Sequence, residues 1–329
     1  MERTRKWRWG VNRWFVLLFL ILGVFAARAY PPILPHVQLP AETLTGPLFS
    51  LPIIGPIYLT NTMVAIFIAD VILLIMAFSV YQAIKGGAMI LMGVAGALEA
   101  ALEALYVLTE STAGKWAKRV FPWIATIVLL VLAVNWMELI PGVDSIGFIH
   151  HAAEGHPVKV LGEVGDIDVV TPVKGVQVET GEPELFTVVP FVRVASTDLN
   201  FTVGLALISF LLIQVFGVWA LGGSYFIKFF NVKSLFTKPF FGAIDFAVSL
   251  LEIVSEFSKI ISFSFRLFGN IFAGSVLLFV IGSLVPILAQ TIFLLLEFLI
   301  GMMQALVFGM LTMIFISQAT IGHGPEEAH

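Results

Sequence analysis

The sequence predicts an all-α integral membrane protein, and three observations support this. Apolar residues make up 59% of the 329 residues, charged residues only 12%, and the mean hydropathy is +0.99. A soluble globular chain is usually about 25% charged. Several apolar runs reach the roughly 20 residues that cross a ~30 Å hydrocarbon layer. We therefore expect about five membrane-embedded helices, of which the last two form a long, strongly tilted pair, and an interfacial amphipathic helix.

The first 29 residues have the features of a secretory signal or an N-terminal anchor. Five basic residues precede the apolar run Trp14–Phe25, and Ala27-Arg28-Ala29 follows it. This order is typical of a cleavable signal, and an uncleaved short anchor fits it equally well. Residues 30–56 are rich in proline and almost uncharged. We expect them to form an extended segment on the outer side.

Three spans and one amphipathic helix are predicted before residue 223. The spans are Ile57–Ile84, Val120–Ile140 and Asn200–Gly222. The first contains Asp70, which we interpret as a structural or partner-facing polar group. Within residues 85–119, glutamates and leucines occupy different helical faces, so this segment is expected at the interface or on a partner.

The charges of the loops predict the orientation. Residues 141–198 carry nine acidic and three basic residues, whereas Gly223–Pro239 carries three lysines and no acid. Cytoplasmic loops are enriched in lysine and arginine. We therefore expect the long acidic loop outside and the tail 321–329 in the cytoplasm. The acidic loop contains a cluster of His150, His151, Glu154 and His156 that suggests a metal site, but a solvated loop is the favoured interpretation.

Residues 240–320 are predicted to form two helices that separate near Pro286. At 1.5 Å per residue both exceed the bilayer thickness, so we expect them to be strongly tilted. The alternative of three upright spans places Glu252, Glu256 and Lys259 within the first span, which is costly in lipid.

A ladder of polar residues follows the first of these two helices. Asp245, Glu252, Lys259 and Arg266 are spaced by seven, so they lie on one helical face. Arg266 is the one charged residue from Ile260 to Leu296, and it cannot lose its proton in a protein.

Each polar group has a structural and a functional interpretation. Glu252 and Lys259 form either an intrahelical pair or a hydrated path to Arg266. Glu297, seven residues before Gln304, is either a salt-bridge partner that fastens the helices through Arg266 or a proton carrier from the other side. Ser275 offers a hydroxyl but no charge.

Five stretches carry a resemblance to one family. They are TNTMVA (60–65), NWMELIPG (135–142), TDLNFTVGLALISF (197–210), FRLFGNIFAG (265–274) and GMMQALVFGMLTMIFIS (301–317). In this order they resemble subunit a of bacterial F-type ATP synthases, over about residues 57–320. The resemblance implies a plasma-membrane stator subunit with two offset half-channels beside a rotating ring of c subunits. It also implies b-type stalk partners, lipid contact and indirect coupling to the F1 sector.

The resemblance assigns roles to individual residues. Arg266 matches the essential cation that faces the ring carboxylates, with Asn270 one turn beyond it and Gln304 on the opposing helix. The positions that match the cytoplasmic side are Glu252, Lys259 and Ser262, and those toward the outer entrance are Glu138 and Asp144. Many members have an acid and a histidine at the positions of Ser275 and Glu297, so here Glu297 is the only titratable member of that pair.

Composition and motifs disfavour other function classes. The chain has no cysteine, no GxxxxGK[ST] loop and no GxGxxG motif after a strand, so we expect no cofactor, no metal, no nucleic acid and no enzyme activity of the chain alone. A secondary transporter that binds an anion at Arg266 is the alternative, but no second copy of the Arg266 segment occurs. An intramembrane hydrolase lacks a histidine in the apolar spans.

Overall fold

Helices dominate the structure. A computed structural model describes residues 9–29, 40–52, 55–86, 93–156, 158–164, 167–172, 186–229, 241–284 and 288–321. The α-helices are α1 (Trp9–Ala29), α2 (Asn61–Lys85), α3 (Gly93–Ala113), α4 (Ala117–Trp136), α5 (Leu199–Leu221), α7 (Phe241–Leu284) and α8 (Leu288–Thr320). Short 3-10 helices extend or join them: η1 (Gly114–Trp116), η2 (Met137–Leu139), η3 (Ala195–Thr197) and η4 (Gly222–Lys228). Among the described residues, five helical segments are long and apolar enough to cross a membrane, which confirms the predicted fold class.

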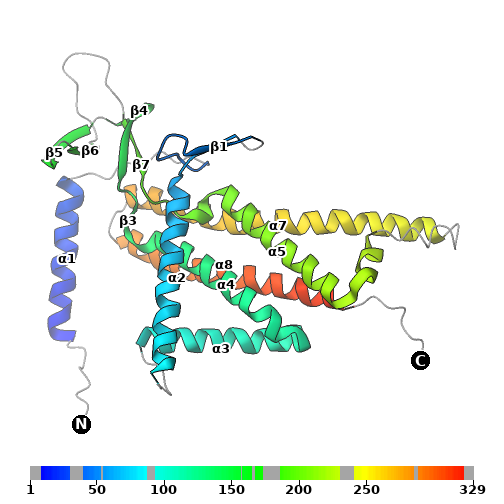
Figure 1. Cartoon of the computed structure of the whole chain (residues 1–329). Coiled ribbons are helices and arrows are strands. Elements are labelled where there is room, and N and C mark those ends of the chain that lie inside the picture. Colours follow the sequence, from blue (N-terminus) through cyan, green and yellow to red (C-terminus); the bar gives the residue numbers. More distant parts are fainter. Residues whose placement is uncertain are drawn as a thin grey trace, which may run out of the picture.

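The last two helices form the long hairpin that the sequence predicts. The 44 residues of α7 span about 66 Å and the 33 residues of α8 about 50 Å, both well beyond a ~30 Å hydrocarbon layer. Both run across α2 rather than alongside it (Figure 1). The alternative of three upright spans is wrong, because Glu252, Lys259 and Arg266 lie within one continuous helix.

The core lies where α4 and α5 pack against the hairpin. α4 packs on α8, and α5 contacts both α7 and α8. Aliphatic side chains fill this interface, and the largest that are almost fully buried are Ile124, Ile213, Leu267, Ile271, Met313 and Ile316. Because the inward face of α7 is anchored in this way, its opposite face is exposed over most of its length in the described part of the chain.

The helix α3 has the predicted amphipathic character. Glu99, Glu103 and Glu110 are exposed, whereas Leu105 and Thr109 are buried against the bundle. The helix α1 stands apart from the bundle, and its apolar side chains are mostly exposed (Figure 1). Cleavage after this segment stays a prediction.

In the described part of the chain, seven short strands lie near the turn end of the hairpin (Figure 1). They are β1 (Phe49–Leu51), β2 (Gly55–Ile57), β3 (Pro141–Asp144), β4 (Gly147–His156), β5 (Val158–Val164), β6 (Ile167–Pro172) and β7 (Phe186–Pro190). β1 pairs with β2, β4 with β7 and β5 with β6, all antiparallel. The histidine side chains of β4, for which the sequence suggested a metal site, lie outside the described residues.

Candidate functional site: a cation between two polar groups

Arg266 lies on the exposed face of α7. Phe263, Leu267 and Ile271 are almost fully buried, and they fix the rotation of the helix so that Arg266 points away from the bundle. Its Nη2 atom donates a hydrogen bond to Ser262 Oγ, one turn earlier, at 3.3 Å. Asn270, one turn later, is exposed on the same face. The structure therefore presents a permanent cation to whatever covers this face.

No carboxylate among the described residues pairs with Arg266. The structural interpretation of Glu297 as a salt-bridge partner of Arg266 is wrong, because the Glu297 side chain is buried against Gly274 instead. Gly274 follows Arg266 by eight residues, or about 12 Å along the helix. Gln304 is partly buried on α8, and the hydrogen bond of Arg266 goes to Ser262 rather than to this amide.

A group of polar residues lies beyond Arg266, toward the turn of the hairpin. Ser275 Oγ donates a hydrogen bond to Glu138 Oε1 at 2.5 Å, which joins α7 to η2. Glu297 is only 4% exposed, and its Oε2 atom has no hydrogen-bond partner in the described part of the chain. The structure thus brings together Glu138, Ser275 and, beside Gly274, Glu297 from three different elements.

The end of α4 is fastened to α8, and this positions Glu138. Asn135 Nδ2 donates to the carbonyl oxygen of Gly301 at 3.1 Å, and Asn135 Oδ1 accepts from Ser196 Oγ at 2.6 Å. Trp136 Nε1 donates to the carbonyl oxygen of Phe298 at 3.1 Å. A buried side-chain amide is costly unless it is paired, so these hydrogen bonds stabilise the position of the C-terminal end of α4.

Asp144 lies farther out, at the end of β3. Its backbone has a φ of 60°, which an aspartate tolerates better than most residues. Burial raises its pKa to about 6, although the positive charge of Arg193 and the backbone N–H of Val194 act in the opposite direction. Arg193 itself donates to Thr197 Oγ1 at 3.2 Å and to the carbonyl oxygen of Pro40 at 3.1 Å. Asp144 is therefore a carboxyl group that titrates near neutral pH at the edge of the bundle.

A second polar group lies on α7 before Arg266. Lys259 Nζ contacts Glu256 Oε1 at 2.7 Å, so of the two interpretations of Glu252 and Lys259, the intrahelical pair is wrong. Residues three apart also meet on a helix, and the side chain of Glu256 is the one that turns toward Lys259. Glu252 is partly buried one turn earlier.

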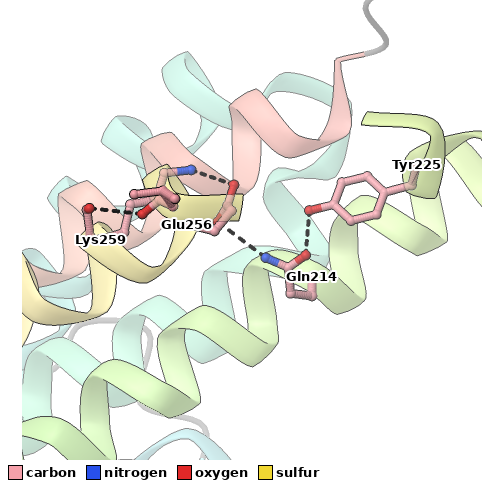
Figure 2. Close-up of polar contacts among 6 residues, drawn as sticks. Gln214, Tyr225, Glu256 and Lys259 are labelled. Carbon is pink, nitrogen blue, oxygen red and sulfur yellow. Dashed lines mark hydrogen bonds and ion pairs between the residues drawn. The ribbon is translucent and has the colours of Figure 1, made fainter. Parts of the chain in front are cut away.

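The sequence analysis did not predict three members of this second group: Glu256, Gln214 and Tyr225. Gln214 Nε2 of α5 donates to Glu256 Oε2 at 3.3 Å, and Tyr225 Oη of η4 donates to Gln214 Oε1 at 2.8 Å (Figure 2). For Glu256, the spacing of three residues from Lys259 was the available signal. Gln214 and Tyr225 come from other elements, and no local pattern connects them with α7.

Asp198 joins two of the stretches that carried the resemblance. Its Oδ1 atom accepts from the backbone N–H of Asn200 at 2.9 Å, which caps α5. Its Oδ2 atom accepts from Thr62 Oγ1 at 3.2 Å, which fastens the start of α2 beside it. Asp198 and Thr62 therefore stabilise the packing of α2 and α5. The polar groups along α7 form the candidate site.

Comparison with known proteins decides the family. The sequence profile of the family described as ATP synthase A chain matches residues 63–317. The chain belongs to the ATP synthase A chain family. The ATP synthase subunit a of Moorella thermoacetica is 26% identical over 270 residues, which are 82% of this chain and 95% of the relative.

Two further relatives with the same description have similar identity. The subunit a of Psychromonas ingrahamii is 30% identical over 245 residues, 70% of this chain and 75% of the relative. That of Campylobacter jejuni is 30% identical over 210 residues, 62% of this chain and 87% of the relative. Together with the five apolar helices, membership in the ATP synthase A chain family makes the chain a multi-pass bacterial membrane protein and a proton-channel subunit of the F-type ATP synthase.

Proposed function

We propose that the chain carries two offset proton paths that end on either side of Arg266 and serve a rotating ring of c subunits. One observation carries the proposal: polar groups lie on both sides of an exposed Arg266 along one helix, and no carboxylate among the described residues pairs with this cation. Glu252 precedes it by 14 residues and Ser275 follows it by nine, or about 21 Å and 13 Å along the helix axis. Arg266 therefore lies between the two polar groups along α7.

The outer path is proposed to run from Asp144 past Glu138 and Ser275 to Glu297. The pKa of about 6 allows Asp144 to take up and release a proton near neutral pH. Glu138 and Ser275 share a hydrogen bond, and the neighbouring Glu297 keeps one carboxylate oxygen free of described partners. A proton that reaches Glu297 is positioned to neutralise a ring carboxylate. A neutral acid enters lipid at far lower cost than an ion.

The cytoplasmic path is proposed to reach α7 near Glu252 and Ser262. A ring carboxyl that arrives there after nearly a full turn meets the charge of Arg266. A nearby cation favours the ionised form of an acid, so the proton leaves toward the cytoplasm. The same fixed charge prevents protons from passing directly between the two paths, with Asn270 and Gln304 as neighbouring polar groups. Each elementary charge that crosses 100 mV releases about 2.3 kcal/mol, so several protons are needed for each ATP made elsewhere in the complex.

The orientation and partners follow from the same proposal. The acidic loop 141–198 lies outside, and the tail 321–329 lies in the cytoplasm, in accord with the positive-inside rule. The ring covers the exposed face of α7, b-type stalk subunits hold the bundle as a stator, and the F1 sector is reached indirectly. Residues 57–320 form the membrane domain, and 240–320 carry the ion path. The chain alone catalyses no reaction.

Substitution of Arg266 tests the proposal. We expect Arg266→Ala to abolish coupled ATP synthesis and ATP-driven proton pumping in vesicles while the complex still assembles. Arg266→Lys is expected to fail as well, because an ammonium is compact, strongly hydrated and lacks the planar fork of a guanidinium. Normal synthesis by Arg266→Ala in an assembled complex would overturn the proposal.

A further inference from the structure

The two basic residues of α7 differ in their exposure to solvent. Lys259 and Arg266 are seven residues apart, so the backbone places both on one face of the helix. Arg266 is exposed there, whereas the side chain of Lys259 is only 18% exposed. Lys259 Nζ contacts Glu256 Oε1 at 2.7 Å and lies 4.7 Å from the centre of the Phe315 ring on α8. Its charge is therefore directed into the bundle and away from the face that presents Arg266.

The carboxyl group of Glu256 is held in a fixed position. Glu256 is 3% exposed, and Lys259 Nζ and Gln214 Nε2 both point at its carboxylate oxygens. Tyr225 Oη donates to the Oε1 atom of Gln214, which leaves the amide NH₂ group free to face Glu256 (Figure 2). The amide of Gln214 thus donates to Glu256 and accepts from Tyr225, which orients this series of hydrogen bonds toward the carboxyl group of Glu256.

The far end of this chain of hydrogen bonds is also fixed by packing. Tyr225 is 2% exposed, and its ring lies against Gly217 of α5. A β-carbon at residue 217 would lie 2.6 Å from Cζ of the ring, so only glycine leaves room for it. Three elements, α5, η4 and α7, thus support one buried carboxylate. An unpaired buried charge is costly, which makes this ion pair a defined part of the structure.

We propose that Glu256 is a positioning residue that keeps Lys259 off the ring-facing surface, so that Arg266 is the only cation that this part of α7 presents there. This proposal rests on the proposed function. Without Glu256, a second cation would stand on the same face about 10 Å before Arg266. A ring carboxylate that passes it would be held in its ionised form, because a nearby positive charge favours that form. Proton uptake from the cytoplasmic path would then require a lower pH.

The surroundings of the pair contain few other titratable groups among the described residues. Glu252 and Glu256 of α7 both lie close enough to Tyr225 of η4 to act on it electrostatically. Among the described residues, the neutral amide of Gln214 on α5 contacts Glu256, and the ring of Phe315 on α8 lies beside Lys259. Removal of the negative charge of Glu256 therefore takes away the ion-pair partner of Lys259.

Charge removal at residue 256, with and without residue 259, tests the proposal in the whole complex. We compare Glu256→Gln, Lys259→Gln, the double variant Glu256→Gln with Lys259→Gln, and the control Glu103→Gln on the exposed face of α3. ATP-driven proton pumping is measured in vesicles against the pH on the F1 side. For Glu256→Gln we expect the midpoint of the profile to move about one pH unit toward acid and pumping at neutral pH to fall about tenfold. The double variant is expected to have the same midpoint as Lys259→Gln alone, and the control to match the wild type.

The outcomes separate a positioning role from a purely structural one. A structural role lowers the amount of assembled complex and the pumping amplitude at every pH without moving the midpoint, and that result would overturn the proposal. A double variant whose midpoint is shifted from that of Lys259→Gln alone would overturn it too. Arg266→Ala is assayed in parallel. If that variant still pumps, the proposed function fails; if only Glu256→Gln behaves as wild type, the function stands and the role of Glu256 falls.

Discussion

Gly274 of α7 and Glu297 of α8 lie in direct contact, with the glutamate carboxyl group over the glycine Cα. A β-carbon at residue 274 would lie 2.5 Å from Cδ of Glu297, which is too close for any side chain. The adjacent Ser275 holds Glu138 by a hydrogen bond. Because Gly274 has no side chain, the carboxyl groups of Glu138 and Glu297 can both approach the turn of α7 that contains Gly274 and Ser275.

Gly274→Ala is expected to displace Glu297 and to impair proton translocation. Overpacking of a well-packed site costs about 1–3 kcal/mol, so the helix pair still forms while the carboxyl group moves. ATP-driven pumping and the yield of assembled complex are measured together. Gly204→Ala is the matched control, because a β-carbon on this glycine of α5 would meet no described atom within 4 Å. Equal pumping by the two variants would show that the position of Glu297 is unimportant.

Glu297→Gln is expected to slow proton flow while the complex assembles normally. The amide keeps the size of the side chain but carries no exchangeable acidic proton at physiological pH. The measurement is passive proton flow through the membrane sector in vesicles from which F1 has been removed. Since Glu297 is buried against Gly274 rather than paired with Arg266, a structural effect through such a salt bridge is excluded. Wild-type flow would remove Glu297 from the outer path.

Asp144 predicts a local dependence of stability on pH. Its folded-state pKa of about 6 lies above the ordinary value for aspartate, so the folded state binds the additional proton between about pH 4 and 6. The stabilisation from this proton is therefore fully present below about pH 4 and is lost as the pH rises through 6. Asp144→Asn removes the titration and tolerates the positive φ.

Amide hydrogen exchange of β3 and β7 in the intact complex measures this effect. The ratio of exchange rates, wild type over Asp144→Asn, cancels the intrinsic effect of pH on exchange. We expect the ratio to rise as the pH increases from about 5 to about 7. A ratio that stays constant over this range would contradict a raised pKa at Asp144.

The sequence predicted the long helices and the placement of Arg266 because both depend on local pattern. The length of an apolar run and a seven-residue spacing are read directly from one segment. The exposed face of α7 follows from the same pattern, since Phe263, Leu267 and Ile271 alternate with Ser262 and Arg266. These features need no knowledge of which helices are neighbours.

The partners of the charged side chains could not be read in the same way. Glu297 was expected beside Arg266, but close approach of α8 at Gly274 places it about two turns farther along. Glu256 and Glu252 are both within reach of Lys259 in sequence, and the amide of Gln214 on α5 helps to fix Glu256 as the partner. Such choices depend on packing between helices, which spacing within one helix does not encode.

Disulfide cross-linking tests most directly whether the Arg266 face of α7 meets the ring. The chain contains no cysteine, so Asn270→Cys introduces a single thiol on the exposed face one turn from Arg266. It is combined with a cysteine beside the ring carboxylate, and Leu207→Cys on the exposed face of α5 is the control. We expect oxidation to cross-link residue 270 to the ring and to stop ATP-driven pumping, and reduction to restore it. Cross-linking from residue 207 but not from residue 270 would contradict the placement of Arg266 against the ring.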